Sequence, residues 1–361
     1  MSLPITLLAG PSTSLRDDLL RCLVLRRPDL VAVSYDVAPA ADGLHLLRRV
    51  VDARGTHQHL RVPLTGCCLS CTVVADAEPA LELVAHGGRW QEAVLALPAS
   101  LQPGPVADAL RGHTDVHVDT LTTVVDALLL RAQLSGDDLL VERGLAAAPG
   151  DRRSTAELVV TQLEEADVLA VADLHRIDTA TARTVEALLA HLAPLALQVP
   201  LGPGGVGVDG VVSTGRRDRA TTTGDRARLA WLAGDLCPPA CGVTTMRWRS
   251  AQPLQPARLD AALPSLLPRV VRSHGHVWLA DRPDQRIVWN SAGGTLSFAD
   301  PVRWHGAPGC ELVLTGVDLD ADALRARLEQ CLATEAELAG PPTWEDPFAR
   351  VLGPATRSAP R

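Results

Sequence analysis

Residues 3–23, LPITLLAGPSTSLRDDLLRCL, decide the fold class. Residues 3–9 are an apolar run that Gly10 closes, and a run of this kind before a glycine predicts a strand that ends in a turn. Apolar residues then recur at helical spacing, as Leu15, Leu19, Leu20 and Leu23. The order of strand, short loop and helix is typical of the first unit of an α/β sheet.

The same alternation continues through the first 200 residues. Further apolar runs predict strands at 30–33, 93–97, 116–118, 124–125, 168–171 and 193–199. Amphipathic segments predict helices at 42–54, 76–86, 155–166 and 179–191. Strands that alternate with helices usually pair in parallel. We therefore expect an α/β domain with a mostly parallel sheet and flanking helices.

A change in composition predicts two domains, as the length of 361 residues also suggests. Residues 201–225, LGPGGVGVDGVVSTGRRDRATTTGD, are rich in Gly and Thr and predict a mobile connection. After a helix near 256–268, the chain predicts strands at 270–280, 285–290, 295–298 and 310–316, and then a helix that carries Leu324, Leu328 and Leu332. We expect a first domain over 1–205, a connecting segment over 206–264 and a small α+β domain over 265–361.

Bulk composition excludes several classes of protein. Hydrophobic residues make up 47% of the chain, but no apolar run approaches the roughly 18 residues of a membrane-spanning helix. The N-terminus has no basic region before its apolar run, so we expect a cytoplasmic protein and not an exported one. The net charge of -8 disfavours a surface that grips nucleic acid as a whole. No direct DNA binding is expected.

The loop after the first strand resembles a phosphate-binding loop only in its position. Such a loop needs backbone N–H groups at a helix start, a lysine for the terminal phosphates and a hydroxyl for magnesium. Here Pro11 removes one N–H donor, and the chain contains no lysine, so all 34 basic residues are arginine. An anion would have only Gly10 and the hydroxyl-bearing residues Ser12, Thr13 and Ser14. We therefore expect no efficient nucleotide hydrolysis, with Arg16 as the nearest cation available to replace the lysine.

Three cysteines within five positions predict metal or redox chemistry. Cys68 and Cys71 have the two-residue spacing that lets both thiolates reach one tetrahedral ion, and soft thiolates favour zinc. Cys67 and a histidine of the His57-Gln58-His59 run are the candidate further ligands. A redox pair and a reduced, buried cluster are the alternatives.

Two further features carry weaker signals. Cys237 and Cys241 flank a rigid Pro-Pro turn and form a candidate second metal pair, whereas the isolated Cys22, Cys310 and Cys331 are expected to fill the core. Asp173 follows the strand at 168–171, where a nucleotide-binding fold can place an aspartate against the base. The alternative is that Asp173 only ends that strand.

An ordered series of short motifs resembles the CobW-like metallochaperone GTPase family over nearly the whole chain. The segment from Cys67 to Thr72 is similar to the family's GCxCCT metal motif, residues 124–127 (VVDA) to a family strand, and residues 166–168 (ADV) to the segment before the guanine box. Residues 272–280, RSHGHVWLA, resemble the opening of the family's C-terminal domain. The resemblance implies a P-loop-GTPase-like sheet, a CobW-type C-terminal domain and bound zinc.

The departures from this family are consistent with one another. The phosphate-loop lysine and the Asn-Lys-x-Asp box are missing, and residues 97–103 (LPASLQP) stand where the family has an acidic turn. This combination is similar to the actinobacterial branch that recruits a hibernation factor to ribosomes under zinc limitation. The resemblance thus implies a zinc-responsive pseudo-GTPase with a ribosome or a hibernation factor as partner. A zinc metallochaperone with weak GTP binding and a protein with only a redox role are the alternatives.

Overall fold

The computed structural model describes residues 2–40, 43–64, 68–146, 148, 150–218, 220–234, 237–340 and 345–354. The chain divides into two compact units. The first comprises residues 1–133 and 138–233, and the second comprises residues 134–137 and 234–361.

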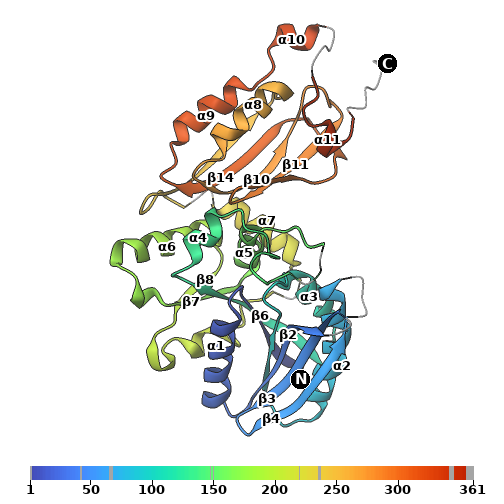
Figure 1. The fold of residues 1–361 in the computed structure, drawn as a ribbon, viewed down its shortest axis with the longest axis vertical. Helices are drawn as coiled ribbons and strands as arrows, with labels where there is room; N and C mark the ends of the chain where they lie inside the picture. The colour runs from blue at the N-terminus through green and yellow to red at the C-terminus, as the bar shows by residue number, and fades with distance from the viewer. Residues whose placement is uncertain are drawn as a thin grey trace. The chain divides into compact units, whose positions relative to one another are not determined.

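The first unit is built on an eight-stranded sheet in the order β4-β3-β2-β5-β1-β6-β7-β8 (Figure 1). The strands are β1 (Leu3–Ala9), β2 (Leu30–Ala40), β3 (Gly43–Asp52), β4 (Gly55–Pro63), β5 (Glu92–Ala96), β6 (Val116–Asp126), β7 (Val168–Ala172) and β8 (Leu197–Pro200). Every pair from β2 to β8 in this order is parallel, as the sequence predicted, whereas β3 pairs antiparallel with both β2 and β4. The result is a parallel sheet with an antiparallel arm at one edge.

The helices of the first unit follow the predicted alternation. They are α1 (Thr13–Arg26), α2 (Leu69–His86), α3 (Pro103–Leu110), α4 (Leu130–Ser135, which ends in the second unit), α5 (Thr155–Glu165), α6 (Thr179–Leu192) and α7 (Thr223–Gly234), with the 3-10 turns η1 (Leu174–Arg176), η2 (Pro203–Gly205) and η3 (Val208–Val211). Across the part of the chain that is described, no helix combines the length and the apolar character needed to cross a membrane.

Side chains of β2 show how the two faces of this sheet are covered. Successive residues of a strand point to opposite faces. Leu30 and Ala32 join the apolar cluster that α1 and η3 cover. Tyr35 points the other way, and its hydroxyl donates a 2.6 Å hydrogen bond to Asp76 of α2. The sheet is thus the middle of three layers.

The predicted helix at 42–54 is wrong, because this segment contains strand β3. Its buried residues Leu46 and Val50 are four positions apart, a spacing that fits one face of a helix and one face of a strand equally well. Pairing with β2 on one side and β4 on the other decides for the strand. The partner β4 is the free edge of the sheet, and nearly all of its residues are exposed.

The connection expected after residue 205 is instead part of the first unit, which extends to Ala233. The segment forms η3, and its valines at 208, 211 and 212 are buried in the cluster under α1. Its glycines suggested mobility, but Gly207 has φ 84°, and a Cβ there would collide with the carbonyl oxygen of Pro200. Glycine therefore permits this tight packing.

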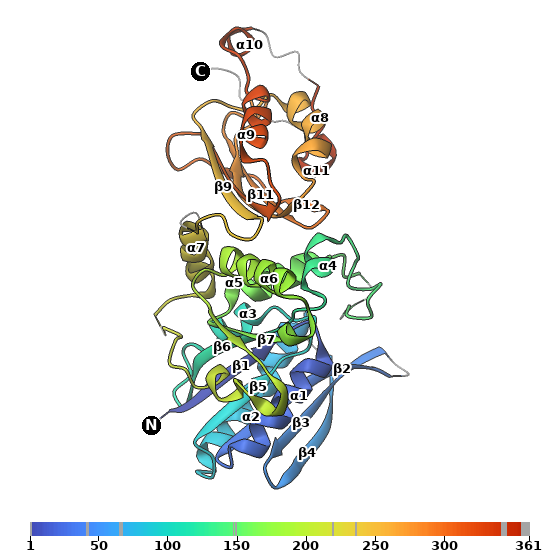
Figure 2. The same ribbon diagram turned by 90° about the vertical axis from the view of Figure 1, so that its left-hand side faces the viewer.

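The second unit is the expected small α+β domain. Its antiparallel sheet has the order β12-β11-β10-β14-β9, with β13 paired to β11. The strands are β9 (Val243–Ser250), β10 (Val270–Val277), β11 (Gln285–Ala292), β12 (Thr295–Phe298), β13 (Val302–Arg303) and β14 (Cys310–Val317). The helices are α8 (Pro256–Leu266), α9 (Ala321–Gln330), α10 (Glu335–Ala339) and α11 (Ala349–Leu352). Figures 1 and 2 show α8 and α9 side by side on the sheet, where they cover Trp248 and Trp289.

Residues 345–354 fasten onto the second unit through one buried arginine. Arg282 donates hydrogen bonds of 2.6 Å both to Asp346 and to the backbone oxygen of Gly353. Phe348 is buried between these contacts and meets Phe298 edge to face at 5.6 Å. This segment therefore completes the core of its unit.

A pH-dependent stability is expected from Glu165, the last residue of α5. Burial raises its pKa to about 7, although the backbone N–H of Gly104 donates to its carboxylate at 2.8 Å and Arg217 lies nearby. Because the folded state holds this proton more tightly than the unfolded state, the stabilisation is complete below the ordinary pKa of 4.5 and is lost as pH rises through about 7. Glu165→Gln keeps an acceptor for the Gly104 N–H. At pH 8 the free energy of unfolding of this variant should be about 2 kcal/mol higher than that of wild type.

Urea unfolding of both proteins at pH 5 and pH 8 measures this effect, with Glu164→Gln as the control for loss of a neighbouring charge. A difference between Glu165→Gln and wild type that is equal at the two pH values would contradict the prediction.

Candidate functional site

The carboxyl edge of the parallel sheet brings together the segments that the sequence singled out. Strands β1, β6 and β7 are neighbours and run parallel, so the loops that follow them meet at this edge. Gly10 follows β1 and Asp173 follows β7, so both lie at this edge, with β6 between their strands. Open α/β sheets bind their ligands at this edge.

The loop from β1 to α1 is too short to encircle a phosphate. Only Gly10, Pro11 and Ser12 separate the strand from the helix, whereas a phosphate loop needs several more residues between its first glycine and its lysine. The Ser12 hydroxyl is already used, since it caps α1 by accepting from the Leu15 N–H at 3.4 Å. It also lies 3.2 Å from the Ser14 hydroxyl, while Thr13 and Ser14 are exposed.

Arg16 occupies the space behind this loop. Its side chain is fully buried, and its guanidinium donates to the backbone oxygens of Leu97 at 2.6 Å and Tyr35 at 3.4 Å. It also pairs with the carboxylates of Asp36 and Asp17, the latter at 2.8 Å. Burial by itself disfavours the charged form, but the two carboxylates outweigh burial and raise the pKa of Arg16. A permanent internal cation therefore joins the start of α1 to β2 and to the end of β5.

The structure pairs Arg16 with the protein's own groups, and its replacement of the missing lysine stays a prediction. Its guanidinium donates to carbonyl and carboxylate oxygens of the protein itself. The lysine of a phosphate loop instead reaches the phosphates of the ligand. Leu97 accepts one of these hydrogen bonds. It is the first residue of the segment 97–103, which contains no acidic residue. The guanidinium thus connects the start of α1 to the segment that begins at Leu97.

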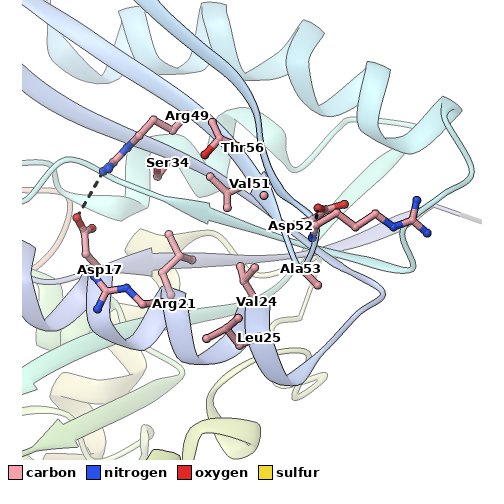
Figure 3. Close-up of a pocket in the computed structure, with 13 residues that line it drawn as sticks. Asp17, Arg21, Val24, Leu25, Ser34, Arg49, Val51, Asp52, Ala53 and Thr56 are labelled. Carbon is pink, nitrogen blue, oxygen red and sulfur yellow. Dashed lines mark hydrogen bonds and ion pairs between the residues drawn. The ribbon is translucent and has the colours of Figure 1, made fainter.

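A groove of about 420 Å³ runs along α1, between this helix and the end of β3. Figure 3 shows Val24 and Leu25 of α1 facing Val51 of β3 across it, with the ion pair of Asp17 and Arg49 at one end. Arg49 also pairs with Asp36 at 2.5 Å, so the charges at that end are satisfied internally. No residue of the β1–α1 loop lines the groove.

Cys68 and Cys71 lie across the first turn of α2, and both are exposed. Their sulfur atoms are 2.8 Å apart, and the Cys71 N–H donates to the Cys68 sulfur at 3.3 Å. Cys68 is the N-cap of the helix, where the partial positive charge of the backbone stabilises an anion. Two thiolates in this geometry supply half of a tetrahedral zinc site.

The remaining ligands are not identified by the structure. Cys67 lies outside the described residues. Among the residues that are described, no group of three or more His, Cys, Asp or Glu side chains is arranged to hold a metal ion. The cysteine pair therefore needs ligands from elsewhere, such as Cys67 or another molecule.

The assignment of His57 or His59 as a ligand is wrong for this arrangement. Both lie on strand β4, and among the described residues neither joins Cys68 and Cys71 in a group that could hold a metal ion. His57 instead contacts Asp52 at 2.7 Å. Although burial favours the protonated form of Asp52, hydrogen bonds from His57, the Arg54 N–H and Trp90 lower its pKa to about 2. His57 thus serves the hairpin at the base of the arm.

The other cysteines divide as expected, except that one pair is untested. Cys310 and Cys331 are buried, and burial raises the pKa of both thiols, that of Cys310 to about 11. Cys22 is half-buried against the cluster under α1. Cys237 is half-buried and Cys241 is exposed, and the second metal pair stays a prediction.

Asp173 stands at the edge of the sheet in a left-handed conformation with φ 60°. Its carboxylate lies 3.5 Å from Arg176 in the following turn and caps no backbone N–H. A role in base recognition stays a prediction.

Sequence reasoning missed the part that Arg16 plays, although a signal was present. Arg16 lies on the stripe that Leu19, Leu20 and Leu23 define, at the spacing of one helix face. A charged residue on the apolar stripe predicts a buried ion pair, because an unpaired buried charge is too costly.

Comparison with known proteins gives one family-model match in the second unit and similar proteins that are named for zinc. Residues 243–332 match the cobalamin synthesis protein cobW C-terminal domain. The chain is 29% identical over 331 residues to a zinc chaperone of Mycobacterium tuberculosis, which covers 85% of this chain and 75% of that protein. It is 22% identical over 317 residues to the zinc-regulated GTPase metalloprotein activator 1 of Dictyostelium discoideum, covering 77% of this chain and 67% of that protein.

Among solved structures, the Zn(II)-bound YjiA GTPase from E. coli aligns with 92% of this chain and 100% of its own. The two are 15% identical, with a TM-score of 0.39.

Proposed function

We propose, from the cobW C-terminal domain at residues 243–332 and from relatives named for zinc, that the whole chain is a CobW-like zinc protein. More specifically, we propose that it is a zinc-responsive adaptor that recruits a hibernation factor to ribosomes when zinc is scarce. The motif series of the sequence suggests this branch of the family.

The contrast between an exposed thiol pair and an arginine that the protein itself pairs behind the β1–α1 loop supports the proposal. Cys68 and Cys71 present an exposed thiol pair at the start of α2. Arg16, by contrast, satisfies the carboxylates and carbonyls behind the β1–α1 loop without any ligand. The protein can therefore respond to zinc more readily than to GTP.

Zinc can act as a switch through the position of its ligands in the chain. Strand β4 is the element that precedes the cysteine pair in the chain, so a bound ion would bear on how the exposed arm lies against α2. A ligand shifts such an equilibrium only by its different affinity for the two conformations. We propose that zinc favours a conformation that hides the partner surface, and that scarcity exposes this surface.

Association with ribosomes should then rise about tenfold when zinc is chelated, a population shift that needs only a tenfold difference in affinity. Co-sedimentation of the full-length protein with purified ribosomes and hibernation factor, at buffered free zinc, measures this. Cys71→Ala should bind at every zinc level as chelated wild type does, and Cys22→Ala should follow wild type. Identical binding of wild type and Cys71→Ala at all zinc levels would exclude the zinc switch.

The second candidate is a zinc metallochaperone with weak GTP binding, and the names of the relatives favour it. Hydrolysis needs a cation to neutralise charge that develops on the phosphate, and Arg16 is committed elsewhere. We therefore expect calorimetry with GTP and magnesium to show no binding, and steady-state assays to show no turnover above a protein-free blank. Turnover that is lost when Ser12 and Ser14 become alanine would favour the chaperone instead.

A further inference from the structure

The cysteine pair has a geometry that suits a covalent reaction as well as a metal. Two cysteines can be bridged without backbone movement only when the fold already brings their Cβ atoms together. Here the two sulfurs face each other at 2.8 Å, and the Cys71 N–H donates to the Cys68 sulfur. The Ser70 hydroxyl lies 3.2 Å from the same sulfur. The first turn of α2 thus holds the thiols in position to react with each other.

Accessibility separates this pair from the buried cysteines. The thiolate is the reactive form, and it is favoured at helix N-termini and disfavoured in apolar surroundings. Cys310 and Cys331 lie in the core of the second unit, where burial raises the pKa of each thiol. Cys68 and Cys71 are exposed at the N-terminus of an 18-residue helix. A small oxidant in solution therefore meets this pair before the buried thiols.

We propose that Cys68 and Cys71 form a reversible disulfide with each other, and that this disulfide and zinc exclude one another. The oxidant is a low-molecular-mass disulfide such as oxidised glutathione. The disulfide step stands on the geometry alone, whereas the competition with metal rests on the proposed zinc function.

The electron balance of the step is that of thiol–disulfide exchange. One cysteine thiolate attacks the small disulfide, forms a mixed disulfide and releases one small thiolate. The second cysteine then attacks the protein sulfur of the mixed disulfide, so that the Cys68–Cys71 bond forms and the second small thiolate leaves. The protein loses two electrons, which reduce the oxidant, and the two thiol protons pass to the released thiolates.

Disulfide and zinc exclude one another because zinc requires thiolate ligands. Once the sulfurs are bonded to each other, neither carries the negative charge that holds the ion. Oxidation would therefore produce the metal-free state at a zinc concentration that otherwise keeps the site occupied. The same adaptor would respond to low zinc and to thiol oxidation through one pair of residues.

The test uses the full-length chain, first without zinc, in glutathione buffers of graded ratio. After acid quenching and alkylation, peptide mass mapping should find one intramolecular disulfide per chain within the tryptic peptide 62–89. Cys67→Ser should form it as wild type does, Cys22→Ser should also form it, and Cys71→Ser should stop at a mixed disulfide with glutathione. Absence of the disulfide in wild type, or its loss in Cys67→Ser, would overturn the assignment of the pair.

The second arm loads the protein with zinc alone before the oxidant is added, and a chromogenic chelator follows the release. One zinc should appear for each disulfide formed, at the same rate. Zinc that stays bound while the disulfide forms would overturn the competition. If the protein takes up no zinc at all but still forms the disulfide, the proposed zinc function fails and the disulfide stands.

Discussion

Arg16→Leu should lower the free energy of unfolding by about 3 kcal/mol, the scale expected when one partner of a buried ion pair is removed. The substitution leaves the carboxylates of Asp17 and Asp36 without this cation, and it leaves the Leu97 and Tyr35 carbonyls without their donor. Leucine fits the apolar stripe of α1 but makes none of these bonds. Denaturant unfolding followed by circular dichroism measures the change.

The matched control lies one turn and a half further along the same helix. Arg21 pairs with Asp18 at 3.0 Å, but both side chains are well exposed, at 69% and 64%. Such surface pairs contribute about 0–1 kcal/mol, so Arg21→Leu should change stability little. If the two variants lose equal stability, Arg16 does not act as the central cation described above.

The second large effect is expected on the affinity of the protein for zinc. The double variant Cys68→Ala, Cys71→Ala should bind zinc at least about a hundredfold more weakly than wild type, because it lacks both thiolates at the start of α2. Competition against a chromogenic chelator at pH 7.5 measures the affinity. In the wild type the affinity should also fall as pH is lowered, because protons compete with the metal for the thiolates.

Cys22→Ala is the control for this measurement, since Cys22 lies half-buried in α1, apart from the cysteine pair in sequence and in fold. Full zinc stoichiometry and affinity in the double variant would require the site to be sought elsewhere, first at Cys237 and Cys241.

Most of the first sheet was predictable, because its parallel strands are apolar runs that helices separate. The failure at β3 has a physical cause, since the Leu46–Val50 spacing fits both periods and only the partners β2 and β4 decide between them. The prediction for the segment after residue 205 failed for the opposite reason. Its composition suggested mobility, but three valines at the right positions are enough to anchor it under α1.

The candidate site was predictable only where its residues are neighbours in sequence. The spacing of Cys68 and Cys71 is enough to place both sulfurs on one helical turn, and the structure confirms that they meet. The contacts of Arg16 join residues up to 81 positions apart, which no local pattern reveals. The histidines were misassigned because closeness in sequence was taken for closeness in space, whereas an extended strand carries residues apart quickly.

The exposed edge strand β4 bears on how the protein behaves in concentrated solution. An unpaired strand edge is a template on which a second chain can add, and proteins suppress such aggregation with charges and irregularities along the edge. β4 carries His59 and Arg61, and its register against β3 shifts between Val50 and Val51. Two copies that approach edge to edge would each bring the guanidinium of Arg61 to the shared ladder, where like charges disfavour pairing. We expect this charge to disfavour edge-to-edge association through β4.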